Sequence, residues 1–336
     1  MAITIKDVAR AAGVSPATVS LVLNNKTQRV RKETVERVRR TAKELDYVVN
    51  RQAQWLQSQK SHLLALLVPD LQNDFYSQVA VAAMEVAQES GYLLTVWSLP
   101  KGKESLRNLE RILKSGEFAG SLVVSRRFDI IRHLWDSSLT TPCVFLDETV
   151  AEDMQSYLVT GDNEFGGRLV AKHFLERGHR HFACITGPEE TPNSTRRLSG
   201  FLKEINDHGL ELSPSCIEVG DYTAEGGYRA AKLLLQQDFT ALFALNDLTA
   251  MGAIRAFWEE GYSVPEDISV IGYDNIDLGR YWLPRLTTVN QHPKEIGRVG
   301  TKQLLEMIDN GQTTGRYLVA PTLVPGASVR DLTKKK

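Results

Sequence analysis

Two patterns of hydrophobic and polar residues divide the chain at about residue 61. Before that point, apolar residues recur every three or four positions, which predicts short amphipathic helices. Beyond it, apolar runs of four to six residues alternate with longer amphipathic stretches. That alternation is typical of buried parallel strands connected by helices. The pattern therefore predicts an α/β protein that carries an all-α head at its N-terminus.

The stretch from Ile5 to Asn24 predicts two short helices joined by a tight turn. Gly13 suits a turn position where a Cβ would be costly, Ser15 is a good N-cap, and Pro16 fits the first helical position. Small apolar side chains line the inner faces of both helices, namely Val8, Ala9, Ala12, Val19, Val22 and Leu23. A steep pair of this kind is a helix-turn-helix, whose second helix can enter the DNA major groove. The alternative is an ordinary helical hairpin in a small core.

Charge favours the DNA-binding interpretation. The first 60 residues carry twelve basic and five acidic side chains, a net charge of +7, while the remaining residues carry −8. The near-neutral total of −1 therefore hides a basic head on an acidic body. A folded head with this asymmetry indicates binding to a polyanion. A third helix, Lys32–Leu45, is expected to pack under the first two.

Two segments, DVARAAGVSPATVSLVLN and ELDYVVNRQAQWL, resemble the DNA-binding head and hinge of the LacI/GalR family of bacterial repressors. The resemblance implies a hinge helix from Asn50 to about Gln57, which folds on DNA as a pair in a dimer. It also places Leu56 where the family wedges a leucine into the minor groove; the alternative is a linker leucine packed on the body. The DNA-binding residues implied are Thr4, Ser15, Pro16, Ala17, Thr18, Ser20, Leu21, Asn24, Arg29, Asn50, Arg51, Ala53, Gln54 and Leu56.

The chain departs from the family pattern at Leu21, where the family usually has arginine. Leucine cannot make the bidentate contact with guanine that arginine makes. Base contacts must then come from Pro16, Ala17, Thr18 and the loop 24–29, which also resembles the family's loop with one residue added. DNA binding survives this change, but the base sequence of the operator does not follow from the family.

The body repeats the strand–helix pattern twice. The expected strands are Leu63–Val68, Tyr92–Trp97, Gly120–Val124, Pro142–Leu146, Tyr157–Val159, Phe182–Thr186, Ala241–Leu245 and Ile268–Gly272. The expected helices are Phe75–Ser90, Leu106–Lys114, Ile130–Trp135, Asn163–Arg177, Thr195–His208, Ala224–Gln236, Leu248–Glu259 and Pro293–Asp309. Two such units predict two doubly wound, parallel-sheet lobes with a ligand cleft at the carboxyl ends of their strands.

The body also resembles the LacI/GalR effector domain, itself similar to periplasmic sugar-binding proteins. Matching segments follow in order: GHRHFACITGP, NSTRRLSGF, GDYTAEGG, ALFALNDLTAMGA, ISVIGYDNID and LTTVNQ. The resemblance implies three crossings between the lobes, with lobe 1 at about 62–160 and 292–320 and lobe 2 at about 161–291 plus the last strand, near 321–331. The expected domains are a head at 1–49, a hinge and linker at 50–61, and an effector-binding and dimerisation domain at 62–336.

The effector-binding residues implied are Asp74, Phe75, Tyr76, Asp147, Arg197, Tyr222, Asn246, Asp274 and Gln291, each where a strand ends or a helix begins. Carboxylates and amides that accept from hydroxyls, a donating arginine and aromatic faces form the chemistry of a sugar site. Structural roles are the alternatives. Asp147 could cap a helix or turn, and Phe75 and Tyr76 could simply pack at a helix start.

Other function classes lack support in the sequence. No apolar run is long enough for a membrane span, and motifs for phosphate-binding loops, dinucleotide binding, serine hydrolases and zinc proteases are missing. His179 and His181 could form a metal site, but we interpret them as solvent-exposed turn residues. Asp247 and Asp274 could form a pair for glycoside hydrolysis, yet nothing beside them supplies an acid with a raised pKa.

These features predict a cytoplasmic, sequence-specific repressor of a sugar-utilisation operon, with no cofactor and no metal. A homodimer would bind a pseudo-palindromic operator, because the chain after Val329 has no room for the heptads that make tetramers. A small sugar in the cleft would control operator affinity. The alternatives are a sugar-binding protein without a DNA role, an effector that is a sugar phosphate or a purine, and an enzyme on the same two-lobed body.

Overall fold

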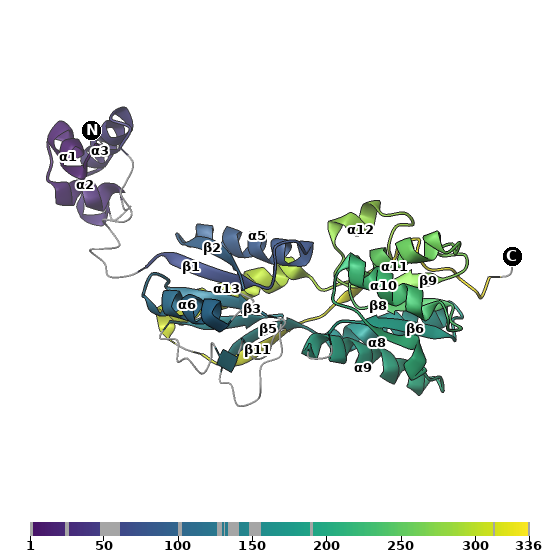
Figure 1. Ribbon diagram of the computed structural model, residues 1–336. Coiled ribbons are helices and arrows are strands. Elements are labelled where there is room, and N and C mark those ends of the chain that lie inside the picture. Colours follow the sequence, from purple (N-terminus) through teal and green to yellow (C-terminus); the bar gives the residue numbers. More distant parts are fainter. Residues whose placement is uncertain are drawn as a thin grey trace. The chain divides into compact units, whose positions relative to one another are not determined.

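The computed structural model describes residues 3–23, 27–47, 61–99, 103–125, 130, 132–133, 141–147, 156–188, 191–311 and 313–334 (Figure 1). The chain forms two compact units, Met1–Lys60 and Ser61–Lys336. The α/β class predicted from the hydrophobic pattern is confirmed. Within the described ranges, no helix is both long and apolar enough to cross a bilayer.

The head consists of α1 (Ile5–Ala12), α2 (Pro16–Leu23), a 3₁₀ turn η1 (Thr27–Arg29) and α3 (Lys32–Glu44). Val8, Val19, Val22 and Val38 are fully buried at the centre of the three helices. Gly13 ends α1 with φ of +64°, a conformation that a Cβ disfavours. The hydroxyl of Ser15 accepts the backbone N–H of Thr18 at 3.1 Å, which is the N-cap bond expected of α2.

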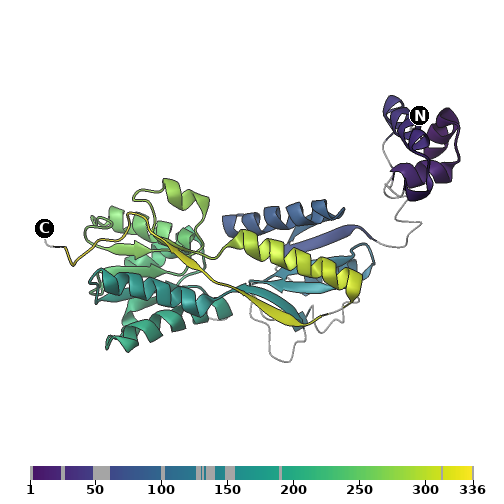
Figure 2. The ribbon, with the colours of Figure 1, turned by 180° about the vertical axis from the view of Figure 1, so that it is seen from behind.

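The first lobe of the body contains a six-stranded parallel sheet in the order β11-β5-β4-β3-β1-β2. On one face, α5 (Asp74–Glu89) packs beside α13 (Pro293–Asn310), as Figure 2 shows, and α6 (Lys103–Lys114) covers the other. The strands are β1 (Leu63–Val68), β2 (Leu93–Ser98), β3 (Gly120–Val124), β4 (Cys143–Leu146), β5 (Tyr157–Gly161) and β11 (Gly315–Val319).

The second lobe contains a four-stranded parallel sheet in the order β7-β6-β8-β9. Its strands are β6 (Phe182–Thr186), β7 (Ile217–Val219), β8 (Ala241–Ala244) and β9 (Ser269–Ile271). Two helix pairs cover it: α8 (Asn163–Glu176) with α9 (Pro192–Asp207), and α10 (Ala224–Leu234) with α11 (Asp247–Glu259). A 3₁₀ turn η2 (Pro214–Cys216) and a short helix α12 (Asp277–Tyr281) complete the lobe.

Two short strands, β10 (Thr288–Asn290) and β12 (Thr322–Val324), pair antiparallel to each other outside both large sheets. Strand β12 falls within the last strand expected near 321–331, whereas β7, β10, β11 and α12 were not expected from the sequence. The predicted boundaries of domains and lobes stay a prediction. Of the expected helix Ile130–Trp135, the described residues include only 130, 132 and 133.

The interpretation of His179 as an exposed turn residue is wrong. Its side chain is buried, with Nδ1 2.9 Å from the Thr240 hydroxyl and Nε2 3.1 Å from the Arg330 carbonyl. Burial lowers the pKa of His179 below its ordinary value, and the neighbouring arginines act in the same direction. His181 is exposed as expected. No group of His, Cys, Asp and Glu suited to a metal ion occurs among the described residues.

The segment after β12 is fixed to the second lobe by hydrogen bonds along β9. Val270 donates its N–H to the Ser328 carbonyl at 2.8 Å, and the Ser328 hydroxyl donates to the Val270 carbonyl at 2.6 Å. Further along, Arg330 donates its N–H to the Ser269 hydroxyl, and Leu332 donates its N–H to the Arg177 carbonyl. Residues from the end of the described chain therefore complete the edge of the second sheet.

Glycines set the spacing of both helix pairs of the second lobe. A Cβ at Gly252 would overlap the carbonyl of Ala224 on α10, and one at Gly200 would overlap the carbonyl of Glu164 on α8. Close backbone approach of this kind excludes any larger residue, because neither side of the contact is a flexible side chain.

We expect Gly252→Ala to lower the free energy of unfolding by about 2 kcal/mol, within the range of an overpacked core. Gly279→Ala is the matched control, since this helical glycine has its nearest neighbours at 3.7 Å or beyond. Alanine normally stabilises a helix by about 1 kcal/mol relative to glycine. Chemical denaturation of both variants measures the difference. Equal or increased stability of the Gly252 variant would contradict the close contact between α10 and α11.

Candidate functional site

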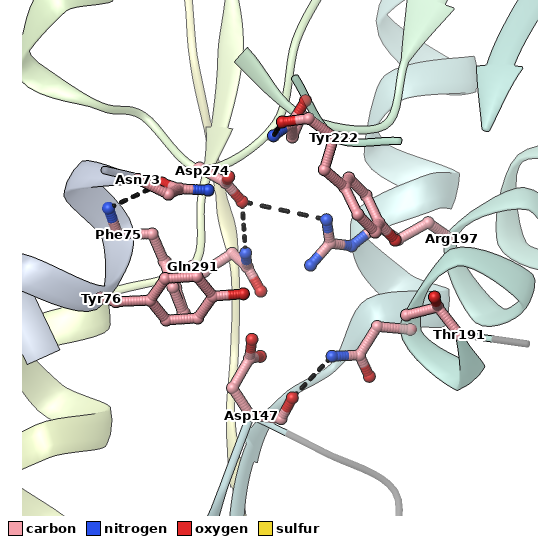
Figure 3. Close-up of a pocket in the computed structure, with 11 residues that line it drawn as sticks. Asn73, Phe75, Tyr76, Asp147, Thr191, Arg197, Tyr222, Asp274 and Gln291 are labelled. Carbon is pink, nitrogen blue, oxygen red and sulfur yellow. Dashed lines mark hydrogen bonds and ion pairs between the residues drawn. The ribbon is translucent and has the colours of Figure 1, made fainter. Parts of the chain in front are cut away.

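A cleft in the body lies where strands from both sheets end. About 350 Å³ of empty space, partly open to solvent, lies between the residues shown in Figure 3. Only about 30 Å³ of that space can hold the centre of a water-sized group. The lining residues are Asn73, Phe75, Tyr76, Asp147, Thr191, Asn193, Arg197, Tyr222, Asn246, Asp274 and Gln291.

Eight of the nine residues predicted to bind the effector line this cleft. They come from seven separate parts of the chain, which the fold brings together: Phe75 and Tyr76, Asp147, Arg197, Tyr222, Asn246, Asp274, and Gln291. Their roles in ligand binding stay a prediction. Asn73, Thr191 and Asn193 line the cleft as well, but sequence reasoning missed them. Their position at or just before the start of a helix was the available signal.

Asp74 does not line the cleft, although it was predicted with its neighbours. As the first residue of α5 its side chain turns outward, and its Oδ2 accepts the Gln78 side-chain amide at 2.8 Å. The same oxygen accepts the backbone N–H of Asp277 at 3.2 Å. Asp74 thus links α5 of the first lobe to α12 of the second. Asn73, the N-cap of α5, occupies the lining position instead.

Arg197 places a buried positive charge at the centre of the site. Its side chain on α9 is only 4% exposed, and its guanidinium lies 3.9 Å from the centre of the Tyr273 ring. Nε donates to Asn163 Oδ1 at 2.8 Å, and Nη1 donates to the Leu245 carbonyl at 2.7 Å. Nη1 is also 3.8 Å from Asp274 Oδ1. The helix, a strand end and the ring together hold the guanidinium in one orientation.

Asp274 faces Arg197 from an unusual backbone conformation. The residue after it, Asn275, has φ of +56°, and Asp274 itself has φ of +113°. Gln291 Nε2 donates to Asp274 Oδ1 at 2.6 Å. This bond joins the loop after β9 to the segment after β10. The strained loop thereby aims the carboxylate into the cleft rather than along the strand.

Asp247 supports that strained loop from behind. It is fully buried, and its carboxylate accepts the Thr288 hydroxyl at 2.5 Å and the backbone N–H of Ile276 at 2.9 Å. Burial raises the pKa of Asp247 well above its ordinary value, and the charge of Asp274 raises it further. Asp247 does not line the cleft, so it and Asp274 do not present two carboxyl groups to one ligand.

Asp147 is a buried carboxylate at the end of β4. Its Oδ1 has no hydrogen-bond partner among the described residues, and the same holds for Gln291 Oε1. Burial raises the pKa of Asp147 to about 7; Arg197 opposes this shift and Asp274 adds to it. Its backbone carbonyl accepts the Asn193 side-chain amide at 2.7 Å, which links the first lobe to α9. Two buried acceptor atoms therefore lack a donor.

Asn246 and Tyr222 carry part of the structure themselves. Asn246 Oδ1 accepts the backbone N–H of Thr249 as the N-cap of α11, and its amide donates to the Tyr222 carbonyl at 3.0 Å. Asn246 therefore has a structural role as a helix cap, which was the alternative to ligand binding. Tyr222 has φ of +65°, and burial raises the pKa of its hydroxyl to about 12. Phe75 and Tyr76 stack edge to face and belong to the core of the first lobe.

In the head, the predicted DNA-binding residues lie at the start of α1 and on the outer side of α2. Pro16, Ala17 and Leu21 are exposed, and Thr18 and Ser20 are half-buried. The Thr4 hydroxyl donates to Asp7 at 2.6 Å, and Ser15 is exposed at the turn. Arg29 is exposed on η1. The predicted residues Asn24, Asn50, Arg51, Ala53, Gln54 and Leu56 lie outside the described residues.

Comparison with known proteins matches both units. Residues 4–50 match the family model for bacterial regulatory proteins of the lacI family, and residues 171–329 match the periplasmic binding protein-like domain. The transcriptional repressor PurR of Vibrio atlanticus (strain LGP32) is 33% identical over 98% of this chain and 99% of its own length.

Two solved structures extend the similarity to the fold. A lac repressor dimer bound to operator and the anti-inducer ONPF matches with a TM-score of 0.86, at 28% identity over 98% of this chain and 100% of that chain. A complex of the transcriptional regulator CelR with cellobiose matches with a TM-score of 0.75, at 29% identity over 97% and 99%. The chain therefore belongs to the LacI family and is a DNA-binding transcriptional repressor.

Proposed function

We propose that the operator affinity of this repressor is controlled by a small sugar bound in the cleft. The observation that supports this most directly is the pair of buried acceptors, Asp147 Oδ1 and Gln291 Oε1, that have no donor among the described residues. A sugar carries several hydroxyl groups in fixed directions, so it can donate to these atoms and to Asp274 while accepting from Arg197. The regulated genes would then belong to a sugar-utilisation operon.

The charge of the lining argues against a sugar phosphate. Two carboxylates, Asp147 and Asp274, face one guanidinium, that of Arg197. A phosphate would add negative charge to a lining in which carboxylates already outnumber cations. A purine is the second candidate, because Phe75, Tyr76 and Tyr222 offer ring faces and several matched relatives are named PurR.

The proposed mechanism uses the contacts that bridge the lobes. Asp74 with the N–H of Asp277 and Asn193 with the carbonyl of Asp147 connect the lobes beside the cleft. An effector that fills the cleft would favour one relative position of the lobes. In a homodimer on a pseudo-palindromic operator, that position would order or disorder the hinge at 50–61 and change operator affinity. Coupling of this kind is typically worth about 1–3 kcal/mol.

The first test is a thermal-shift screen of the full chain against sugars, sugar phosphates and purines. A ligand present at about 100 times its Kd adds about 2.7 kcal/mol to the free energy of unfolding. That gain moves Tm by several degrees for a domain of this size. We expect a hit among the sugars. A hit confined to purines would replace the sugar as effector class, while operator binding would be unaffected by that outcome.

We expect Asp274→Asn to weaken binding of the hit by at least tenfold, because it removes a charge-assisted hydrogen bond to a ligand hydroxyl. Operator binding in the absence of ligand should be retained. The matched control is Asp238→Asn, the same chemical change in an exposed carboxylate of the body that lies outside the lining. Calorimetric titration measures ligand binding, and fluorescence anisotropy with labelled operator measures DNA binding. Equal affinities for both variants would place the effector elsewhere.

Ligand affinity is expected to fall as the pH is lowered through about 7. The reason is that the pKa of Asp147 is raised to about 7, and only the ionised carboxylate accepts from two hydroxyls. Between pH 8 and pH 6 the ionised fraction falls about tenfold, so Kd should rise by up to about tenfold. Asp147→Asn should bind more weakly at pH 8 and show no such pH dependence. A flat wild-type profile would argue against a hydroxyl on Asp147.

A further inference from the structure

The outer side of α2 carries almost no group that can read a base by hydrogen bonds. The sequence of this helix, PATVSLVL, contains no Arg, Lys, Asn, Gln, Asp or Glu. Bidentate recognition of guanine uses Arg or Lys, and that of adenine uses Asn or Gln. None of these contacts is available from α2. Its base discrimination must therefore use hydroxyl groups or apolar contacts.

The hydroxyl groups on this helix have structural partners. Thr18 Oγ1 lies 3.0 Å from Ser15 Oγ, and Ser15 Oγ also accepts the backbone N–H of Thr18. Ser15 thus caps the helix, and the hydroxyl of Thr18 is paired with that of Ser15. Ser20 is half-buried and has a contact of its own. The hydroxyls of Ser15 and Thr18 are therefore oriented by each other, and the exposed apolar side chains remain as the other means of discrimination.

What α2 does present is an apolar strip, defined here as Ala17 and Leu21. The two residues are four positions apart, so they share one side of the helix. Ala17 is exposed and Leu21 is 39% exposed, whereas Val19 and Val22 are fully buried in the core of the head. A single exposed leucine is common on protein surfaces and does not by itself indicate a binding site. On the second helix of a helix-turn-helix with a net charge of +7 within residues 1–60, it faces the position of the major groove.

We propose that the Ala17–Leu21 strip reads thymine through its C5 methyl group. That methyl is the apolar group that base edges display in the major groove, and cytosine lacks it. Exposed basic residues such as Arg29, Arg31 and Lys32 would supply phosphate contacts, which give affinity without base sequence. Each operator half-site would then carry a thymine under Leu21. The proposal rests on operator binding by the helix-turn-helix and deepens it by naming the base that is read.

The test starts from an operator enriched from a random duplex library by the full-length protein. Each thymine of that operator is then replaced by uracil, which removes the methyl and keeps the base pairing. At one symmetric position, we expect the wild type to lose about fourfold in affinity for one substituted half-site and about fifteenfold for both. These losses correspond to one buried methyl group per half-site. Fluorescence anisotropy at constant salt measures them.

Two variants assign the effect to the strip. Leu21→Ala should bind thymine and uracil operators equally at that position, with the Tm of the head unchanged because Leu21 is exposed. Leu21→Arg should shift the selected base towards guanine. The matched control is Leu233→Ala on α10, a leucine that is 55% exposed in the body and should leave the discrimination as in the wild type.

The outcomes separate this inference from the function on which it rests. An enriched operator that shows no sensitivity to uracil at any thymine overturns the thymine assignment and leaves operator binding intact. Uracil sensitivity that survives unchanged in Leu21→Ala also overturns it, because the thymine then does not lie under Leu21 as proposed. A library that yields no enriched sequence overturns operator binding, and the thymine assignment falls with it.

Discussion

Burial of one guanidinium organises the cleft of this protein. A charge removed from water must be met by acceptors in fixed positions, or the fold loses stability. Arg197 is met by the Asn163 amide, the Leu245 carbonyl, the ring of Tyr273 and the carboxylate of Asp274. These partners come from the start of one helix, the end of one strand and a strained loop. The need to pair this buried charge therefore fixes the positions of the residues around it, and with them the shape of the cleft.

Buried polar contacts also support the cleft from behind the residues that line it. The loop that carries Asp274 holds two residues at positive φ, and Asp247 compensates for that conformation by accepting from Ile276 and from Thr288 on β10. Thr288 precedes the segment that leads into α13 of the first lobe. Asp247, which does not line the cleft, thus connects the loop of Asp274 to the strand from which the chain continues into α13. Deep polar networks of this type fix one arrangement when every member has its partner.

Much of this arrangement followed from the hydrophobic pattern and from residue types at strand ends. Apolar runs such as Leu63–Val68 and Phe182–Thr186 identified buried parallel strands, and the resemblance to the LacI/GalR family implied which residues near their ends line the cleft. The pattern failed where tertiary contacts decide. Strand β10 is only three residues long, and β11 is exposed over most of its length, so neither has the sequence pattern of a buried strand. Asp74 and Asn73 are both good helix-start residues, and only the helix phase determines which one faces the cleft.

The prediction that His179 is exposed to solvent was wrong for a related reason. A polar residue in a turn is normally solvated, and its burial here depends on Arg330, which is 151 positions away in the chain. No local pattern carries that information. For the exposed face of α2, by contrast, the local sequence is sufficient. The eight residues of this helix include no charged or amide side chain. Its meaning, however, depends on the structural finding that the hydroxyls of Ser15 and Thr18 are engaged with each other.

The fixed C-terminal segment has a consequence for how the protein is made. Both lobes need residues that are synthesised late. Helix α13 and strand β11 complete the first lobe, and residues 328–332 form hydrogen bonds with the edge of the second. The head needs only residues before 48, and it forms a core of its own. During translation the basic head can therefore fold well before either lobe can close. A nascent chain on the ribosome would carry a finished DNA-binding module while its regulatory half is still incomplete.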